Sequence, residues 1–260
     1  MDLKLTGRKA LVTGGSKGIG LAIALRLALE GCEIVLVARS QSELESAAAS
    51  ISAQAGRHAG ITALDMGSAA AAERLCRLHP DIDILVNNAG DIPGGSIEQV
   101  SAQALRDSWN VKVFGYMDLI REYLPLMRAR GHGVILNIIG VAGEMVDAAY
   151  VAGSAGNAAL IAMTRAVGST SLEYGVRVLG INPGPVATDR MMRILHKRAA
   201  ERLGNAERWP ELQARFPAGR AADVDEIAAT AALLCSPLSG YTSGTVFNID
   251  GGLSSRQSIA

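Results

Sequence analysis

The chain has 260 residues, of which 49% are hydrophobic and 19% are charged, and its 25 lysines and arginines balance 25 aspartates and glutamates. A formal net charge of zero gives no electrostatic reason to expect binding to nucleic acid or to an anionic membrane. No apolar run reaches the ~20 residues that span a bilayer. Cys32, Cys76 and Cys235 have no paired spacing, so we expect neither a disulfide nor a metal site. These features predict a soluble, cytoplasmic protein.

Short apolar runs alternate with longer amphipathic runs along the chain, which is the pattern of a parallel sheet covered by helices on both faces. The strands that we expect are Lys9–Thr13, Glu33–Ala38, His58–Leu64, Ile82–Asn87, Gly133–Ile139, Arg177–Asn182 and Thr245–Ile249. The helices that we expect lie near Ile19–Glu30, Gln41–Ala55, Ala69–Leu78, Ala102–Arg130, Tyr150–Tyr174 and Asp223–Cys235. Because no repeat or low-complexity linker divides the chain, we expect one domain over residues 1–260.

The segment at about 190–220 differs from the rest, since it follows a proline-rich turn and is rich in Arg, Ala and Glu. We expect a helical flap outside the sheet, at a place where doubly wound folds carry elements that cover the substrate.

A glycine-rich loop, Thr13-Gly-Gly-Ser-Lys-Gly-Ile-Gly20, follows the first expected strand and opens the first expected helix. Its glycines allow a tight turn, a close approach of backbone to a pyrophosphate, and close contact between helix and strand. The helix amino terminus supplies amide donors to the phosphates. This placement predicts a dinucleotide-binding loop rather than a structural turn, with contacts from Gly14, Ser16, Lys17, Gly18, Ile19 and Gly20.

The second expected strand ends in Ala38-Arg39-Ser40, about twenty residues after the glycine loop. An NAD site has an acidic side chain there that accepts from the ribose 2′-hydroxyl. This chain has Ala38 and Arg39, with Lys17 near the same region. Two cations without a carboxylate suit a 2′-phosphate, so we expect NADP rather than NAD. The alternative is that both cations are solvated surface charges.

A further strand ends in Asn87-Asn-Ala-Gly90, where amides can tie strand ends together and two small residues leave room for a flat ligand. Together with the glycine loop, this motif resembles the short-chain dehydrogenase/reductase family. The resemblance continues through Asn110, Asn182-Pro-Gly-Pro-Val-Ala-Thr188 and Asp250-Gly-Gly252, and so covers nearly the whole chain. It implies an α/β fold of Rossmann type: a doubly wound parallel sheet of about seven strands in the order 3-2-1-4-5-6-7.

The resemblance also implies roles at matching positions. Tyr150 aligns with the proton donor to the substrate carbonyl and contacts the cofactor, and Asn110 with the residue that holds a proton-relay water at a local helix break. Asp65 resembles the adenine contact, with Met66 beside it. The remaining implied cofactor contacts are Asn88, Ala89, Gly90, Pro183, Gly184, Val186 and Thr188. A homotetramer or dimer built on the helices near 102–130 and 150–174 is implied as well.

Two positions depart from the family pattern. Gly140 stands where the family has a serine that hydrogen-bonds the substrate oxygen, and Ser154 stands where it has a lysine four residues after the tyrosine. The chain has no lysine between Lys112 and Lys197, so a shifted register does not restore that lysine. In the family the lysine lowers the pKa of the tyrosine and binds the nicotinamide ribose. Without it a phenol remains a competent acid but a poor base at neutral pH.

The sequence therefore predicts an NADP(H)-dependent oxidoreductase that interconverts a carbonyl and a secondary alcohol on a small molecule. Tyr150 would act as acid and base, and the backbone near Gly140 would replace the serine contact. Ser154 either takes part in catalysis, by binding the ribose or a water, or belongs to a stripe of small residues used in helix packing. The alternative function is a dinucleotide-binding protein with little turnover, acting as a sensor or an inactive assembly partner. A third option makes Glu144 or Asp147 the acid.

Overall fold

The computed structural model describes residues 1–256, and within them seven parallel strands form one sheet in the order β3-β2-β1-β4-β5-β6-β7. From edge to edge the strands are β3 (Ala59–Ala63), β2 (Glu33–Ala38), β1 (Lys9–Thr13), β4 (Ile84–Asn87), β5 (Gly133–Ile138), β6 (Val176–Pro183) and β7 (Val246–Ile249). This order confirms the expected doubly wound sheet. The strand order reverses between β1 and β4, and open α/β sheets bind ligands beyond the carboxyl ends of the strands at such a switch point.

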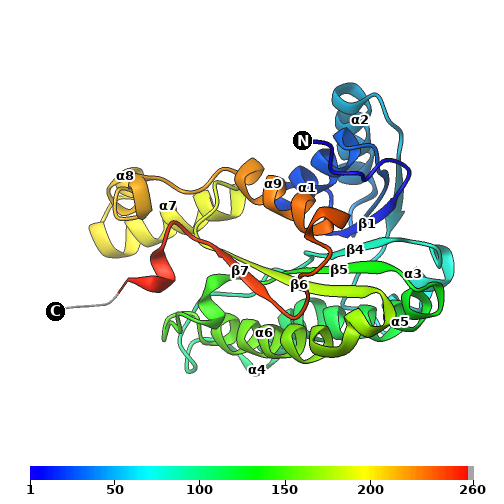
Figure 1. Ribbon diagram of the computed structural model, residues 1–260. Coiled ribbons are helices and arrows are strands. Elements are labelled where there is room, and N and C mark those ends of the chain that lie inside the picture. Colours follow the sequence, from blue (N-terminus) through cyan, green and yellow to red (C-terminus); the bar gives the residue numbers. More distant parts are fainter. Residues whose placement is uncertain (257–260) are drawn as a thin grey trace.

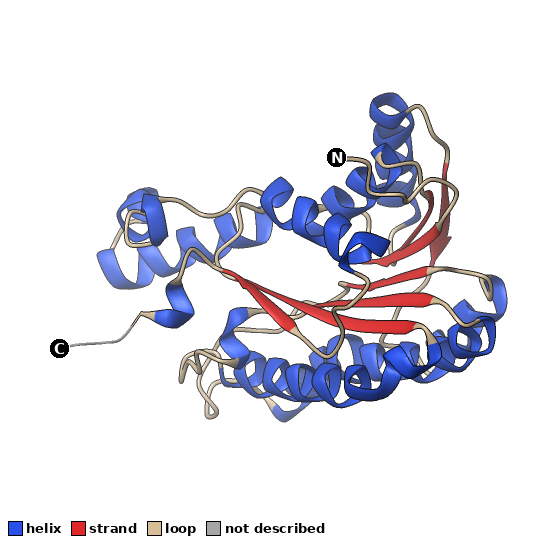
Figure 2. Cartoon of the chain, viewed as in Figure 1, coloured by secondary structure: helices blue, strands red, loops and turns tan. Residues whose placement is uncertain are grey.

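Helices cover both faces of the sheet, as Figure 1 and Figure 2 show. One face carries α1 (Gly18–Leu29), α2 (Gln41–Ala55) and α9 (Val224–Cys235), and the other carries α3 (Ala71–Leu78), α4 (Ala102–Trp109), α5 (Gly115–Arg130) and α6 (Val151–Ser171). Side chains alternate between the two faces of a strand. In β1, Ala10 and Val12 are buried on one face and Leu11 on the other. The central strands are therefore apolar on both faces, which explains their continuous hydrophobic runs.

The helix expected over residues 102–130 is interrupted. After α4 ends at Trp109, residues Asn110–Phe114 form a π-helical turn, and α5 begins at Gly115. This turn is the local break that the family resemblance implied at Asn110. Such turns are rare and occur frequently at functional sites, because they change the face on which the following side chains lie.

Residues 189–219, here called the flap, lie outside the sheet. Its helices α7 (Asp189–Leu203) and α8 (Trp209–Gln213) pack on each other around Leu195, Ala199 and Leu212. Figure 1 shows the flap in yellow and orange, projecting beyond the carboxyl end of β6. Within residues 1–256, no helix is both long enough and apolar enough to cross a membrane.

Candidate active site

The glycine loop lies between β1 and α1, at the switch point of the sheet. Gly14 and Gly18 have φ angles of +63° and +56°, which glycine adopts without strain. A Cβ on Gly20 would lie 2.3 Å from the carbonyl oxygen of Gly14, so only glycine allows α1 to begin this close to the loop. Lys17, the residue before α1, makes no capping hydrogen bond with its side chain. The loop thus presents bare backbone and a helix amino terminus, as a pyrophosphate site requires.

Thr13 and Asn88 hold this loop against the end of β4. Asn88 Nδ2 donates to the carbonyl oxygens of Thr13 and Gly14, at 3.0 and 3.1 Å. In return, Thr13 Oγ1 accepts from the backbone N–H groups of Asn88 and Ala89, at 3.0 and 3.1 Å. These bonds join the ends of β1 and β4, as expected for the asparagine pair, and place Ala89 beside the glycine loop.

The expected adenine and nicotinamide contacts lie at the ends of β3 and β6. Asp65 follows β3, and its Oδ1 accepts from the backbone N–H of Gly67 at 2.9 Å. Met66 beside it is buried. Thr188 follows β6, and its side chain caps α7 and lies 3.5 Å from the point where a Cβ on Gly18 would be. The turn over residues 183–188 therefore lies next to the glycine loop.

Tyr150 lies just before α6 rather than inside it, with a φ of −145°. The Ser154 N–H donates to the Tyr150 carbonyl at 2.9 Å as the helix begins. Tyr150 also pairs with Gly95 in an isolated parallel bridge. A Cβ on Gly153 would lie 2.0 Å from Tyr150 Cε1, so the phenol ring fills the space that a side chain at 153 would need. Among residues 1–256, nothing hydrogen-bonds the Tyr150 hydroxyl, which leaves it available to a ligand.

The two departures from the family pattern are both engaged inside the protein. Ser154 is buried, and its Oγ accepts from the backbone N–H of Asp147 at 3.0 Å. The N–H of Gly140 donates to Asn182 Oδ1 at 3.3 Å, and its carbonyl oxygen accepts from Asn157 Nδ2 at 3.3 Å. The only backbone donor of Gly140 itself is therefore in use, so a backbone contact that replaces the serine would have to come from a neighbouring residue.

Gly140 is also fixed by its conformation and its surroundings. Its φ and ψ are both 138°, a region that residues with a side chain rarely adopt. A Cβ on Gly140 would lie 2.9 Å from Asn157 Nδ2. Asn157 is 2% exposed, and its Oδ1 has no hydrogen-bond partner among the described residues. A serine at 140 does not fit this arrangement without a change in the backbone or in Asn157.

Residues 8–199 match the family model described as short chain dehydrogenase. The chain belongs to the short-chain dehydrogenase/reductase family. It is 32% identical to galactitol 2-dehydrogenase (L-tagatose-forming) of Cereibacter sphaeroides, over 96% of each chain. It is 31% identical to gluconate 5-dehydrogenase of Gluconobacter oxydans, over 96% of this chain and 95% of that one.

Solved structures of the family superpose closely on this chain. L-Sorbose reductase of Gluconobacter frateurii, complexed with NADPH and L-sorbose, gives a TM-score of 0.90 at 29% identity, covering 99% of this chain and all of that one. NAD+-bound xylitol dehydrogenase gives 0.88 at 27% identity, covering 96% and 100%. This short-chain dehydrogenase is therefore an oxidoreductase with a nicotinamide dinucleotide cofactor, and its bare glycine loop fits the diphosphate of that cofactor. The two relatives bind NADPH and NAD+, so they do not select between the two.

A carboxylate that the sequence pattern did not reveal lies at the expected ribose 2′ end of this dehydrogenase. Glu43 accepts from Lys17 Nζ at 2.9 Å and from Ser16 Oγ at 3.1 Å. These two hydrogen bonds, and the charge of Arg39, lower the pKa of Glu43. Ser40 Oγ caps α2 by accepting from the Glu43 N–H at 3.3 Å, which holds Glu43 in the first turn of the helix. The expectation of two cations without a carboxylate is therefore wrong for this region.

The two carboxylates proposed as alternative acids are occupied by neighbouring groups. Glu144 pairs with Arg165 at 3.2 Å and accepts from Asn248 Nδ2 at 2.6 Å. Asp147 Oδ1 accepts from the backbone N–H of Ala149 at 2.8 Å. These contacts give both side chains a local structural role and argue against either as the acid.

Lys112, which sequence reasoning overlooked, lies beside the candidate site. It lies in the π-helical turn, two residues after Asn110, and its ammonium group donates to the carbonyl oxygen of Ile139 at the end of β5. A Cβ on Gly90 would lie 2.8–3.1 Å from carbons of the Lys112 side chain. Burial, together with the nearby charge of Arg190, lowers the pKa of Lys112 to about 7. Its position inside the expected helix break was the signal that could have revealed it.

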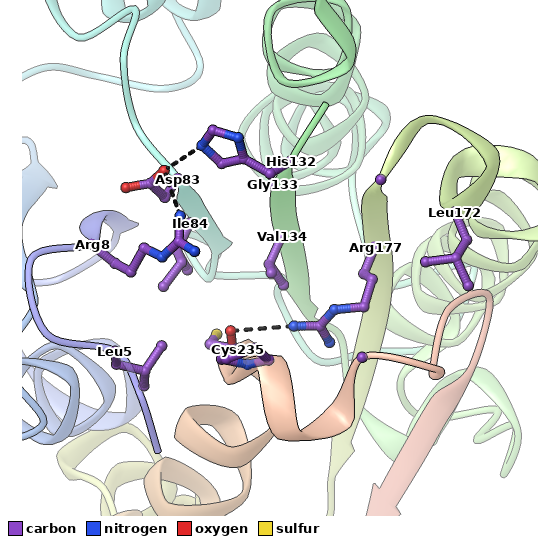
Figure 3. A pocket seen from close by; sticks show the side chains of 13 residues that line it. Leu5, Arg8, Asp83, Ile84, His132, Gly133, Val134, Leu172, Arg177 and Cys235 are labelled. Carbon is purple, nitrogen blue, oxygen red and sulfur yellow. Dashed lines mark hydrogen bonds and ion pairs between the residues drawn. The ribbon is translucent and has the colours of Figure 1, made fainter. Parts of the chain in front are cut away.

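A cavity of about 210 Å³ lies near the amino ends of β4, β5 and β6, opposite the glycine loop (Figure 3). At its wall Asp83 contacts Arg8 at 3.4 Å and His132 at 3.0 Å. Arg177 donates to the carbonyl oxygen of Cys235 at 3.2 Å, and the figure shows it directed at the end of α9. These polar groups satisfy one another, and no expected site residue lines the cavity. We therefore place the candidate active site at the carboxyl ends of the strands.

Proposed function

We propose that this protein is an NADP(H)-dependent oxidoreductase that interconverts a carbonyl and a secondary alcohol. The observation that carries the proposal concerns Tyr150, which lies directly before α6, the helix that follows β5. The Tyr150 hydroxyl makes no hydrogen bond within residues 1–256. Tyr150 is also held in place by the backbone bridge to Gly95. A phenol so placed can donate a proton to a carbonyl oxygen that is being reduced.

The bound dinucleotide would supply or accept the hydride, and the chain's own residues would bind it and handle the proton. The glycine loop would hold the diphosphate, and the turn over residues 183–188 would orient the nicotinamide end. At neutral pH a phenol gives a proton to a developing alkoxide more readily than it takes one from an alcohol. We therefore expect reduction of the carbonyl to be faster than oxidation of the alcohol near pH 7.

The preference for NADP rests on the cations at the ribose 2′ end. Arg39 is exposed and forms no ion pair within residues 1–256, and Lys17 can exchange its exposed partner Glu43 for a 2′-phosphate. The relatives are named for galactitol, gluconate, L-sorbose and xylitol. This supports a small polyhydroxylated carbonyl compound or alcohol as the substrate, covered by the flap.

The test combines cofactor binding with turnover. Fluorescence titration measures the Kd values of NADPH and NADH, and a panel of ketoses, aldoses and polyols is then assayed for oxidation or reduction of the cofactor. We expect NADPH to bind more tightly than NADH, and Tyr150→Phe to lower kcat by about 10²–10⁴-fold without loss of NADPH binding. Absence of saturable binding by either dinucleotide contradicts the proposal.

A second function, dinucleotide binding with little or no turnover, is favoured by one observation. The Ser154 hydroxyl and the Gly140 N–H, at the two positions of departure, are both used inside the protein. Tight NADPH binding with no turnover across the whole panel, unchanged in Tyr150→Phe, selects this second function.

A further inference from the structure

Lys112 lies between the ends of β4 and β5, on the side of the glycine loop away from Arg39 and Lys17. Its side chain packs on Gly90, which follows β4, and its ammonium group reaches Ile139, which follows β5. Dinucleotides cross an open α/β sheet at the switch point, with their two halves on opposite sides of it. Because Arg39 and Lys17 mark the adenosine half beside β1 and β2, Lys112 lies on the nicotinamide half.

The Lys112 ammonium group has N–H donors that no residue within 1–256 accepts. An ammonium has three N–H donors, and in residues 1–256 the only hydrogen bond from Nζ goes to Ile139. No carboxylate of the described residues lies within ion-pair distance of it. A half-buried cation without a counter-charge is costly for a fold to keep. A ligand that brings oxygen acceptors to it removes that cost.

We propose that Lys112 is the cation of the cofactor site and that its ammonium group donates to oxygen atoms of the nicotinamide-side ribose of the bound dinucleotide. Ser154 on α6 does not supply this contact, because it carries no charge and its hydroxyl is buried against the Asp147 N–H. The inference rests on the proposed function, since it requires that the protein binds the dinucleotide.

The proposed contact between Lys112 and the ribose makes the affinity for the dinucleotide depend on pH. Burial lowers the pKa of Lys112 to about 7, so the free protein loses the ammonium charge as the pH rises through that value. The charged groups around Lys112 are Arg190 on α7 and Asp91 after β4, which pair with each other at 3.2 Å. The π turn, the end of β5 and residues 151–160 of α6 contain no other charged side chain. A guanidinium and a carboxylate keep their charge between about pH 6 and about pH 8.5, whereas the 2′-phosphate of the ligand has a second pKa of about 6. Because 2′,5′-ADP carries the same 2′-phosphate, the change in affinity for NADPH relative to 2′,5′-ADP in this range reports on Lys112.

Three variants separate the charge of Lys112 from its structural bond to Ile139. Lys112→Gln keeps an N–H donor for the Ile139 carbonyl but removes the charge, and Lys112→Arg keeps a charge that does not titrate. Lys197→Gln removes an exposed lysine of the flap and serves as the matched control. Thermal unfolding identifies any variant whose fold is weakened, and Lys112→Arg keeps the test decisive if Lys112→Gln unfolds.

The readout is the Kd of three ligands, measured by calorimetry without any turnover. These are NADPH, 2′-phospho-ADP-ribose, which retains the nicotinamide-side ribose, and 2′,5′-ADP, which lacks it. We expect Lys112→Gln to weaken the first two by about tenfold or more and to leave 2′,5′-ADP unchanged. Wild-type affinity for NADPH should fall as the pH rises through about 7, and Lys112→Arg should remove most of that dependence.

Four results would overturn the inference, and one of them would overturn the proposed function as well. If the wild type binds none of the three ligands, the proposed function is overturned and the inference with it. If the wild type binds NADPH and folded Lys112→Gln binds it equally well, the inference alone is overturned. Equal weakening of 2′,5′-ADP would also overturn it, because that ligand has no atoms on the nicotinamide side. If Lys112→Gln does not fold, a Lys112→Arg variant with the pH dependence of the wild type overturns it as well.

Discussion

The ring of Tyr150 lies where the side chain of residue 153 would be, so Gly153 and Tyr150 form one packing unit at the start of α6. Gly156, one turn further along, has a different neighbour, since a Cβ there would lie 3.0 Å from Val113 and 3.2 Å from Trp109 Nε1. The stripe of small residues on α6 therefore serves at least two purposes within the chain itself. One of them is to hold the phenol against its own helix.

The Tyr150–Gly153 contact predicts that the effect of Gly153→Ala on the free energy of unfolding changes sign when the Tyr150 ring is removed. Gly153→Ala should destabilise the wild type, because the ring must leave its place. In a Tyr150→Ala background the same change should stabilise by roughly 0.5–1 kcal/mol, since alanine favours a helix over glycine. Denaturant unfolding of the four proteins measures the coupling. An equal effect of Gly153→Ala in both backgrounds would show that the ring does not occupy this space.

The conformation of Gly140 predicts that restoring the family serine destabilises the protein. Gly140→Ser places a side chain at a φ of +138° and near Asn157 Nδ2, and we expect a loss of about 1–3 kcal/mol in the free energy of unfolding. Gly131→Ser is the control, because Gly131 has a φ of +73° but open space around it. Adding Asn157→Ala should recover part of the loss at 140 only. A smaller loss for Gly140→Ser than for Gly131→Ser contradicts the crowding described around Gly140.

The pairing of Glu43 with Lys17 predicts that Glu43 opposes NADPH binding. Glu43→Gln frees Lys17 and removes a negative charge from the expected 2′-phosphate position. Because both side chains are largely exposed, we expect a modest gain, about two- to fivefold in the Kd of NADPH at low salt, with NADH unchanged. Glu45→Gln, two residues along α2, is the control. A gain that is equal for NADH, or that persists at high salt, argues against this electrostatic origin.

The sheet and the glycine loop could be predicted from the sequence because each depends on local patterns. The short apolar runs predicted β1 and β2 to the residue, and the family resemblance predicted the strand order. Glu43 was missed because a helix cap at Ser40, rather than proximity in a motif, brings its carboxylate to Lys17. Lys112 was missed because the family pattern has its lysine four residues after the tyrosine, on α6. Lys112 instead lies in the π-helical turn between α4 and α5.

The backbone conformation of Gly140 could not be predicted from the sequence either. A glycine in place of a serine reads as the loss of a hydroxyl. In the structure Gly140 also adopts a backbone that a serine resists, and its N–H and carbonyl groups are bonded to Asn182 and Asn157. Neither asparagine is near Gly140 in the chain, so only the packed fold reveals that the positions depend on one another.

The flap has a small core of its own, around Leu195, Ala199 and Leu212. Substitutions within that core can reshape the flap without disturbing the packing of the sheet or of the glycine loop. Mutations in the two regions should therefore combine additively in stability. Such independence would let the residues that cover the substrate change while the cofactor-binding loop keeps its packing.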